Sequence, residues 1–448
     1  MPSTPRYVTA LVSALRFRDA QPELMRALDD SEWNQLLVFG DHMHLTIPLA
    51  QAHGDYCPAW VRSKVDQKIA DNTQRFQMIK QSYAEIDGAL KSAGANYVVL
   101  KGFTKSPDCA PEPRHRVQGD IDLFCDPESI ERAARALATI GYEPIYRFDD
   151  MPWDHLPPLR RKTSWQWWGN VYDPEMPLSV ELHHCLWDYA AVRCGPQDLS
   201  RFWERRVVRQ LEEITFPALD PVDSLGYLAL NLLRDLLRLS ILTSQVYELA
   251  WFLHQNSDNS EFWRCWSAEH DEELKRVESV SFLLAKTWFH CDLPGAVAEQ
   301  IERLPVGARR WFELAATSPS PMGWMRPTKD AVWLHSTLIS SAAEGRRVVL
   351  NRLFPRRPHP VNVVVAEKTL EGSLSKSKVS WSERAHQYLV YLVARVSYHL
   401  GLLLPTLWHG VRWWWSCKMT GADRPLGRRI AGQADEATVP ARQSSSTI

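Results

Sequence analysis

Two aspartates one residue apart lie in a stretch that otherwise has the composition of a β-strand. In RVQGDIDLF (116–124), Ile121 and Leu123 favour burial. The carboxylates of Asp120 and Asp122, in contrast, lose hydration when a sheet covers them. Residues i and i+2 of a strand point to the same side, so the two carboxylates are expected to project together. Unpaired anions at that spacing repel each other, and a divalent cation that prefers oxygen ligands, Mg²⁺ or Mn²⁺, would remove the conflict.

The composition is that of a folded globular protein without a strong overall electrostatic field. Of the 448 residues, 45% are hydrophobic and 23% are charged, and the formal net charge is -1. A chain so close to neutral is not expected to bind a long nucleic acid through its overall charge.

The cysteines and the N-terminal segment predict a cytoplasmic protein. The eight cysteines form no CxxC pair and no compact Cys/His array, so a zinc site is not expected. Their pattern is typical of free, buried thiols in a reducing compartment. The N-terminal segment has no uninterrupted apolar run, so we predict no signal peptide.

Hydrophobic periodicity divides the chain into four regions. Apolar residues at helical spacing predict helices over 1–95 and again over 217–350. Between them, 96–216 alternates strand-like runs with a helical segment, which predicts an α/β or α+β unit. Residues 351–448 begin as a basic, proline-containing linker and end in a polar tail that we expect to be disordered. The strand candidates are YVVL (97–100), RVQGDIDLF (116–124), EPIYRF (143–148) and PLSVELHH (177–184).

The segment HQYLVYLVARVSYHLGLLLPTLWHGVRWWW (386–415) is apolar and nearly long enough to span a bilayer. Arg395 and Pro405 interrupt it, and as a helix it would keep a broad apolar face. Three interpretations stay open: a helix docked on the protein or on another copy, a peripheral helix at a membrane surface, and a membrane-spanning helix. The tryptophan triplet at its end, with Arg412 and Lys418, suits the headgroup level of a membrane.

A third acidic residue is expected to complete the metal site. Glu181 lies in the middle of PLSVELHH, and a carboxylate in so apolar a stretch needs a partner. A phosphate site is predicted nearby, because Gly102 ends a buried strand and a helix starting there would present free backbone N–H groups. Lys101 and Arg116 add positive charge for the same phosphates, and Gly119 leaves room for a ligand.

These motifs together resemble those of the DNA polymerase β-like nucleotidyltransferase superfamily. They are VVLKG, which ends at Gly102, GDIDLF, which contains Asp120 and Asp122, and VELH, which contains Glu181. More specifically, they are similar to a bacterial nucleotidyltransferase family that is often described as uncharacterised. The resemblance implies an α+β fold in which a nucleotidyltransferase core over 96–216, a small mixed sheet with helices, is flanked by N- and C-terminal helical regions.

The resemblance also implies a reaction and a role for each site residue. Asp120 and Asp122 would hold the metals that bridge the nucleotide phosphates. Glu181 would hold the second metal and help to activate the acceptor hydroxyl, while Gly102 and the helix after it would bind phosphate. The expected reaction transfers an NMP from an NTP, with ATP the expected donor, to a hydroxyl of an unidentified acceptor. A small molecule or sugar intermediate fits the neutral charge of the chain better than a long nucleic acid does.

Two further residues are candidates for the site, and each has a structural alternative. His183 and its neighbour His184 point to opposite sides of a strand, so only one of them can face the site. A purely structural histidine is the alternative for His183. Glu248 lies where the family tends to carry an acidic residue on a helix. Its alternative is a helix cap or a salt bridge with Arg234 or Arg238.

The phosphate-binding residues also have alternatives, and so does the function. Lys101 could be an ordinary strand-end lysine, and Arg116 could form a salt bridge with Asp120. The chain has Phe103 after Gly102, where the superfamily usually has serine or glycine, so phosphate binding could differ. Two other functions fit the same motifs: a toxin-like modifier of RNA or protein, and a catalytically inactive nucleotide-binding or scaffold protein.

Overall fold

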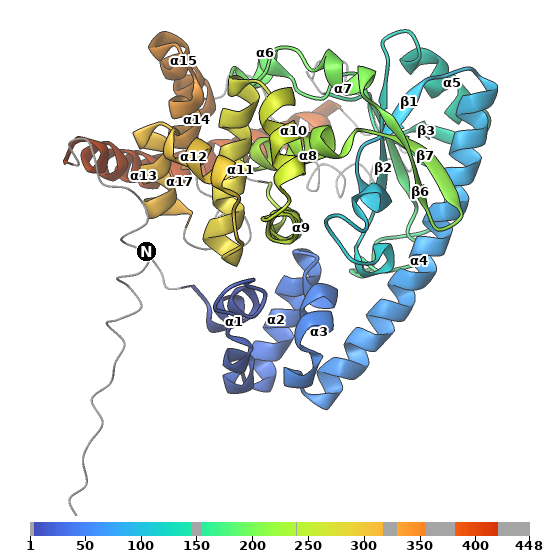
Figure 1. Ribbon diagram of the computed structural model, residues 1–448, viewed down its shortest axis with the longest axis horizontal. Coiled ribbons are helices and arrows are strands. Elements are labelled where there is room, and N and C mark those ends of the chain that lie inside the picture. Colours follow the sequence, from blue (N-terminus) through green and yellow to red (C-terminus); the bar gives the residue numbers. More distant parts are fainter. Residues whose placement is uncertain (1–3, 146–153, 239, 317–328, 355–380, 420–448) are drawn as a thin grey trace, which may run out of the picture.

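The computed structural model of the chain describes residues 4–145, 154–238, 240–316, 329–354 and 381–419 (Figure 1). Within these ranges the chain is an α+β protein, in which helical regions flank a seven-stranded mixed sheet. The predicted fold class is therefore confirmed. The predicted disordered tail and most of the predicted linker before the C-terminal helix lie outside the described residues.

The sheet has the strand order β3-β4-β5-β2-β1-β7-β6. Its central strand, β2, pairs antiparallel with β1 and parallel with β5. β1 also pairs parallel with β7, which forms an antiparallel hairpin with β6. The strands are β1 (Tyr97–Val99), β2 (Asp120–Cys125), β3 (Tyr142–Pro144), β4 (Leu159–Arg161), β5 (Ser179–His183), β6 (Val207–Leu211) and β7 (Ile214–Ala218).

Three of the four predicted strands are found where the sequence places them, as β1, β2 and β5. The prediction over 143–148 overlaps β3 only in part, because β3 ends at Pro144 and residues 146–148 lie outside the described residues. The sequence pattern does not predict β4, β6 and β7. β4 is only three residues long, and two of them are arginines, so it lacks the alternation of a typical strand.

Helices precede and follow the sheet in the chain. Those before it are α1 (Arg6–Ala14), η1 (Pro22–Ala27), α2 (Asp30–His42), α3 (Thr46–His53), η2 (Gly54–Tyr56) and α4 (Ala59–Ser92). Those between strands are η3 (Gly102–Lys105), η4 (Pro113–His115), α5 (Ile130–Thr139), α6 (Tyr189–Val192) and α7 (Ser200–Glu204). Those after the sheet are α8 (Pro221–Arg238), α9 (Thr243–Gln255), α10 (Ser260–Glu269), α11 (Glu272–Phe289), α12 (Gly295–Glu302), α13 (Val306–Ala315), α14 (Ala331–Leu338) and α15 (Ala342–Leu353).

The two faces of the sheet pack against different helices. Ile121 and Leu123 of β2 are fully buried in an apolar cluster with residues of α4 and α5. Val98 of β1 joins the cluster on the opposite face, which contains residues of α8 and α9. Since side chains alternate along a strand, Asp120 and Asp122 face the α8 side of the sheet. Ile121 and Leu123 anchor the strand from behind.

The first three helices and the helices after the sheet share one apolar core. Buried residues of α1, α2 and α3 belong to the same cluster as those of α8, α9 and α11. α4 then runs from these first helices along the sheet (Figure 1). The helical regions on the two sides of the sheet in the sequence are therefore brought together in space.

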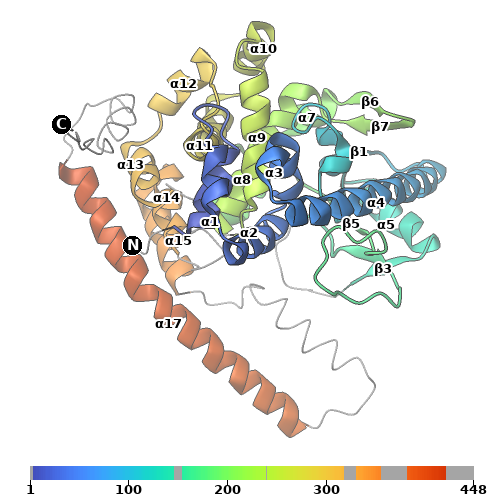
Figure 2. The same cartoon turned by 90° about the horizontal axis from the view of Figure 1, so that it is seen from below.

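The last described helix, α17 (Trp381–Met419), contains the whole apolar segment 386–415 and continues through Pro405. It packs against α13 and lies along the outside of the molecule (Figure 2). None of the helices in the described ranges is both long enough and apolar enough to cross a membrane.

Candidate metal and nucleotide site

The parallel pairing of β2 and β5 brings the predicted acidic residues together. Asp122 is the register partner of Glu181, and Asp120 is the partner of Ser179 on the same pair of strands. Partners in a parallel sheet point to the same face, so these carboxylates project together toward the α8 side. Asp120, Asp122 and Glu181 are called the site carboxylates below.

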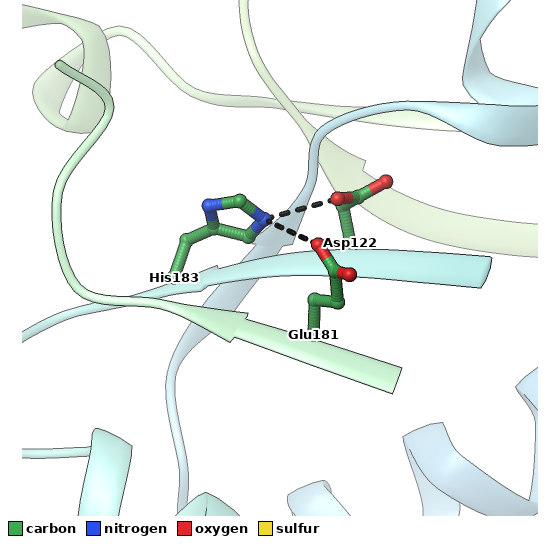
Figure 3. A group of neighbouring side chains, drawn as sticks. All are labelled: Asp122, Glu181 and His183. Carbon is green, nitrogen blue, oxygen red and sulfur yellow. Dashed lines mark hydrogen bonds and ion pairs between the residues drawn. The ribbon is translucent and has the colours of Figure 1, made fainter. Parts of the chain in front are cut away.

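Three side chains at this point could hold a metal ion: Asp122, Glu181 and His183 (Figure 3). One ligand atom from each lies within 4.8 Å of the others. His183 Nε2 donates a hydrogen bond to Asp122 Oδ1 at 3.0 Å and lies 3.7 Å from Glu181 Oε2. His183 is buried and faces the site, while His184 is exposed. Asp120 is outside this group of three.

Asp122 is the most enclosed of the site carboxylates and is held ionised. Lys101 Nζ donates to the same oxygen, Asp122 Oδ1, at 2.9 Å. Burial opposes ionisation, but Lys101 and His183 outweigh it and hold the pKa of Asp122 below its usual range. The other oxygen, Oδ2, is buried and has no hydrogen-bond partner among the described residues. Such an atom costs free energy unless a ligand or ion satisfies it.

The pKa of Asp120 is shifted in the opposite direction from that of Asp122. Burial, together with the negative charges of Asp122 and Glu181, raises the pKa of Asp120 to about 7. The site therefore holds more carboxylate than its own cations can balance. A divalent cation fits this donor set, because carboxylate oxygens suit Mg²⁺ and Mn²⁺. A ligating imidazole from His183 would favour Mn²⁺ over Mg²⁺.

A second layer of charged residues surrounds His183 and Glu181, and the sequence motifs do not reveal it. His183 Nδ1 lies 3.7 Å from Asp154 Oδ2, and Asp154 forms an ion pair with Arg234 of α8. His155 Nε2 lies 3.8 Å from Glu181 Oε2. Asp154 and His155 follow an undescribed segment, and nothing in their local sequence indicates that they reach the site.

The predicted phosphate-binding turn differs in form from the expectation. Gly102 begins η3, a 3₁₀ helix of four residues, rather than a regular α-helix. Its φ of +73° suits glycine, and an added Cβ would come within 2.1 Å of the side chain of Gln118. Gly102 is thus explained by its backbone conformation and by contact with Gln118. At Gly119, in contrast, an added Cβ would meet no described atom within 4 Å, so there is room for a ligand beside it.

Arg116 and Glu248 form a salt bridge with each other, and not with the partners considered for them from the sequence. Arg116 Nε donates to Glu248 Oε1 at 2.7 Å, and Lys105 Nζ donates to Glu248 Oε2 at 2.7 Å. The predicted partner of Arg116, Asp120, is therefore wrong. So are the predicted partners of Glu248, since the guanidinium of Arg234 binds Asp154 instead. The contacts attach the loop between β1 and β2 to α9.

A buried arginine of α4 supports the strands that carry the site carboxylates, and the sequence motifs do not reveal it either. Arg75 Nε donates to the carbonyl of Gln118, just before β2, at 2.8 Å. Its Nη1 donates to the carbonyls of Asp173 and Met176, in the loop before β5, at 3.1 and 2.8 Å. Burial lowers the pKa of Arg75 to about 10, so the guanidinium stays charged at neutral pH. Arg75 thus links the starts of both site strands.

Of three comparisons with known proteins, one finds a related family. No curated protein and no solved structure matches the chain. The model of a protein family described as "Uncharacterised nucleotidyltransferase" matches residues 29–290, which is more than half of the chain. That range contains α2, the whole sheet with all the site carboxylates, and the helices through α11. The chain therefore belongs to the uncharacterised nucleotidyltransferase family.

Proposed function

We propose that the protein is a metal-dependent nucleotidyltransferase that moves an NMP from an NTP to an acceptor hydroxyl. The observation that carries this proposal is the convergence of Asp122, Glu181 and His183 within 4.8 Å, beside Asp120. Family membership supports nucleotidyl transfer in general, and the charge at the site supports a divalent cation. ATP is the proposed donor, and a small molecule or sugar intermediate is the proposed acceptor.

Each residue has a task that follows from its position. Asp120, Asp122 and Glu181 would hold Mg²⁺ or Mn²⁺, which when bound neutralises phosphate charge and favours in-line attack by a hydroxyl. His183 orients Asp122 through its 3.0 Å hydrogen bond, and Lys101 fixes the same oxygen. Glu181 also lies next to a second histidine, His155. Glu181 is also 21% exposed, which suits a group that an attacking hydroxyl reaches from solvent.

The nucleotide would have to approach from the open side of the site. The cavity behind Lys101, lined by residues of η3 and α8, has a volume of about 20 Å³, which holds about one water molecule. Glu181 is 21% exposed, and space is free beside Gly119. Gly102, Gly119, Lys101 and Arg116 are the proposed contacts of the nucleotide phosphates. Glu248 holds the side chain of Arg116 in place.

The proposal is tested by following the phosphate that moves. Full-length protein is incubated with Mg²⁺ or Mn²⁺ and ATP labelled in either the α- or the γ-phosphate, with a cell extract as the source of acceptors. Nucleotidyl transfer puts the α-label on an acceptor and releases pyrophosphate. The double variant Asp120→Ala/Asp122→Ala and the variant Glu181→Gln should both lose this transfer. Glu143→Gln is the matched control, because Glu143 lies in β3 of the same sheet and pairs only with surface Lys162 among the described residues.

Other outcomes separate the alternatives. Transfer of the γ-label instead of the α-label would contradict nucleotidyl transfer. An α-label found in RNA or protein rather than in a small molecule would support a toxin-like modifier. Nucleotide binding that is unchanged by a chelator and by Asp120→Ala/Asp122→Ala would support a non-catalytic nucleotide-binding or scaffold protein.

A further inference from the structure

The second half of α17 is fixed to the rest of the protein by several side-chain contacts. Trp413 stacks on Trp333 of α14, with ring centroids 6.0 Å apart and an interplanar angle of 22°. Trp413 Nε1 donates to the carbonyl of Gly307 at 2.7 Å, and Trp333 Nε1 donates to that of Thr406 at 3.1 Å. His409 Nδ1 lies 2.6 Å from Oδ2 of Asp330, the residue just before α14. One face of α17 is therefore committed to α13 and α14.

The position of Gly410 shows how closely α17 approaches α14. An added Cβ at Gly410 would come within 2.3 Å of the Trp333 ring, so only glycine allows this contact. Residues 406, 409, 410 and 413 lie on the same face of a helix. The opposite face of α17 is consequently held in a fixed orientation, directed away from the body of the protein.

The opposite face is apolar and exposed along most of the helix. Its large apolar side chains are between 40% and 74% exposed and follow one another at intervals of mostly three or four residues. This spacing places them in one stripe. The members of the stripe are Leu389, Val393, Val396, Leu400, Leu404, Leu407, Trp408, Val411, Trp414, Trp415 and Met419. At 1.5 Å per residue the stripe is about 45 Å long, and a continuous apolar surface of this size marks an interaction site.

The charged residues of α17 favour an anionic lipid surface over a second copy of the chain as the partner of this stripe. The helix contains a single acidic residue, Glu383, near its start, against four basic residues, Arg384, Arg395, Arg412 and Lys418. If a second copy packed its own α17 on the stripe, two helices of net positive charge would meet, and one glutamate per helix could not pair with four cations. An anionic lipid surface supplies the missing negative charge.

The aromatic residues of the stripe suit the same partner. Trp408, Trp414 and Trp415 are between 52% and 63% exposed. Indole rings are favoured at the headgroup level of a bilayer, where one edge is wet and the other apolar. Lys418 Nζ lies 5.4 Å from the ring centroid of Trp414, so a cation stands beside this aromatic group. We infer that α17 binds peripherally to an anionic membrane surface, with its exposed apolar stripe buried in the interface.

The inference is tested by flotation of the full-length protein with lipid vesicles. Phosphatidylcholine vesicles are compared with vesicles that also contain phosphatidylglycerol. The protein should float with the anionic vesicles, less with the neutral ones, and less with the anionic ones at high salt, because salt screens the attraction. Leu404→Glu should lower the bound fraction by roughly tenfold or more, since burial of a leucine side chain is worth at least that factor. Leu404 is 74% exposed and is not required by the docked face, so the variant should fold.

A matched control separates a local effect from a general one. Val208 of β6 is also 74% exposed, so Val208→Glu adds the same charge on a different surface and should float like the wild type. Three results would overturn the inference. They are no flotation with anionic vesicles, equal flotation of Leu404→Glu and the wild type, and a dimer in solution that Leu404→Glu converts to a monomer. The last result would assign the stripe to a second copy of the chain.

Discussion

The site carboxylates and a second buried cluster in the helical core contain the same kinds of residue but differ in their balance of charge. In the helical core, His270 Nδ1 lies 2.9 Å from Glu278 Oε1, and Nε2 lies 3.5 Å from Asp223 Oδ1. Arg205 donates two hydrogen bonds to the carboxylate of Asp223. Two fully buried acids, Asp223 and Glu278, therefore meet two cations, and His270 is fully buried as well. Arg205 also binds the more exposed Glu269 at 2.7 Å.

The cluster at the sheet is arranged differently. Its three carboxylates share one lysine and two histidines, Glu181 is partly exposed, and the charges of Asp122 and Glu181 raise the pKa of Asp120. A balanced, closed cluster like that of His270 serves the stability of the fold. An unbalanced cluster with access to solvent is typical of a site that awaits a charged ligand. The contrast separates structural charge from functional charge within one molecule.

The largest effect is expected for Asp122→Asn. The amide keeps the size of the side chain but removes the charge that, as we propose, holds the metal. Nucleotidyl transfer should fall by at least about a thousandfold, which is the scale of metal and electrostatic contributions to catalysis. The free energy of unfolding, measured by urea denaturation, should fall by less than in Asp223→Asn, because loss of this charge also relieves its repulsion of Asp120. A transfer rate within tenfold of the wild type would contradict the proposed role.

Asp223→Asn is the matched control from the balanced cluster. It leaves the Arg205 guanidinium and a protonated His270 without their shared acid, and such losses cost about 3 kcal/mol or more. The variant should therefore lose stability while its folded fraction keeps the transfer rate. If both variants lost stability equally and both kept activity, the distinction between the two clusters would fail.

A smaller and pH-dependent effect is expected for His270→Gln. Burial opposes the charge of His270, but Glu278 and Asp223 outweigh it and raise its pKa to about 9. A raised pKa stabilises the folded state fully below the unfolded value of about 6.5, and this contribution is lost as the pH rises through 9. The variant should be less stable than the wild type by about 3 kcal/mol near pH 6 and by little above pH 9. A difference that is constant with pH would contradict this account.

The smallest effect is expected for metal affinity as a function of pH. Because the pKa of Asp120 is about 7, a proton competes with the metal below that pH. The Kd for Mn²⁺ should rise by about tenfold for each pH unit below 7 and should level off above it. Isothermal titration with Mn²⁺ across this range measures the slope. An affinity independent of pH between about 5 and 7 would show that Asp120 is not a ligand.

The same contrast explains how far the sequence could predict the molecule. The strand pattern around Asp120 and Asp122 is local, so periodicity alone places these two carboxylates on one face of a strand. Glu181 is joined to them by the family resemblance, since periodicity does not show which strands are neighbours. The partners of these residues are not local. Glu248 meets Arg116 from 132 positions away, and no periodicity encodes that contact.

The supporting residues follow the same rule. Arg75 reaches the loop before β5 across about a hundred positions, where it binds the carbonyls of Asp173 and Met176. Backbone carbonyls carry no sequence signal, so such a contact cannot be read from residue types. The short strand β4 is held by pairing with its neighbours β3 and β5 rather than by its own composition. These features depend on tertiary contacts, whereas the pair Asp120 and Asp122 can be recognised from the local pattern.

The most direct test of the central claim is a crystal structure of the protein with Mn²⁺ and a non-hydrolysable ATP analogue, recorded with the anomalous signal of manganese. The claim predicts an anomalous peak in contact with Asp122 and Glu181, with Asp120 or His183 completing the ligands and the phosphates of the analogue beside it. A peak elsewhere, or the analogue bound with no manganese between these side chains, would contradict it.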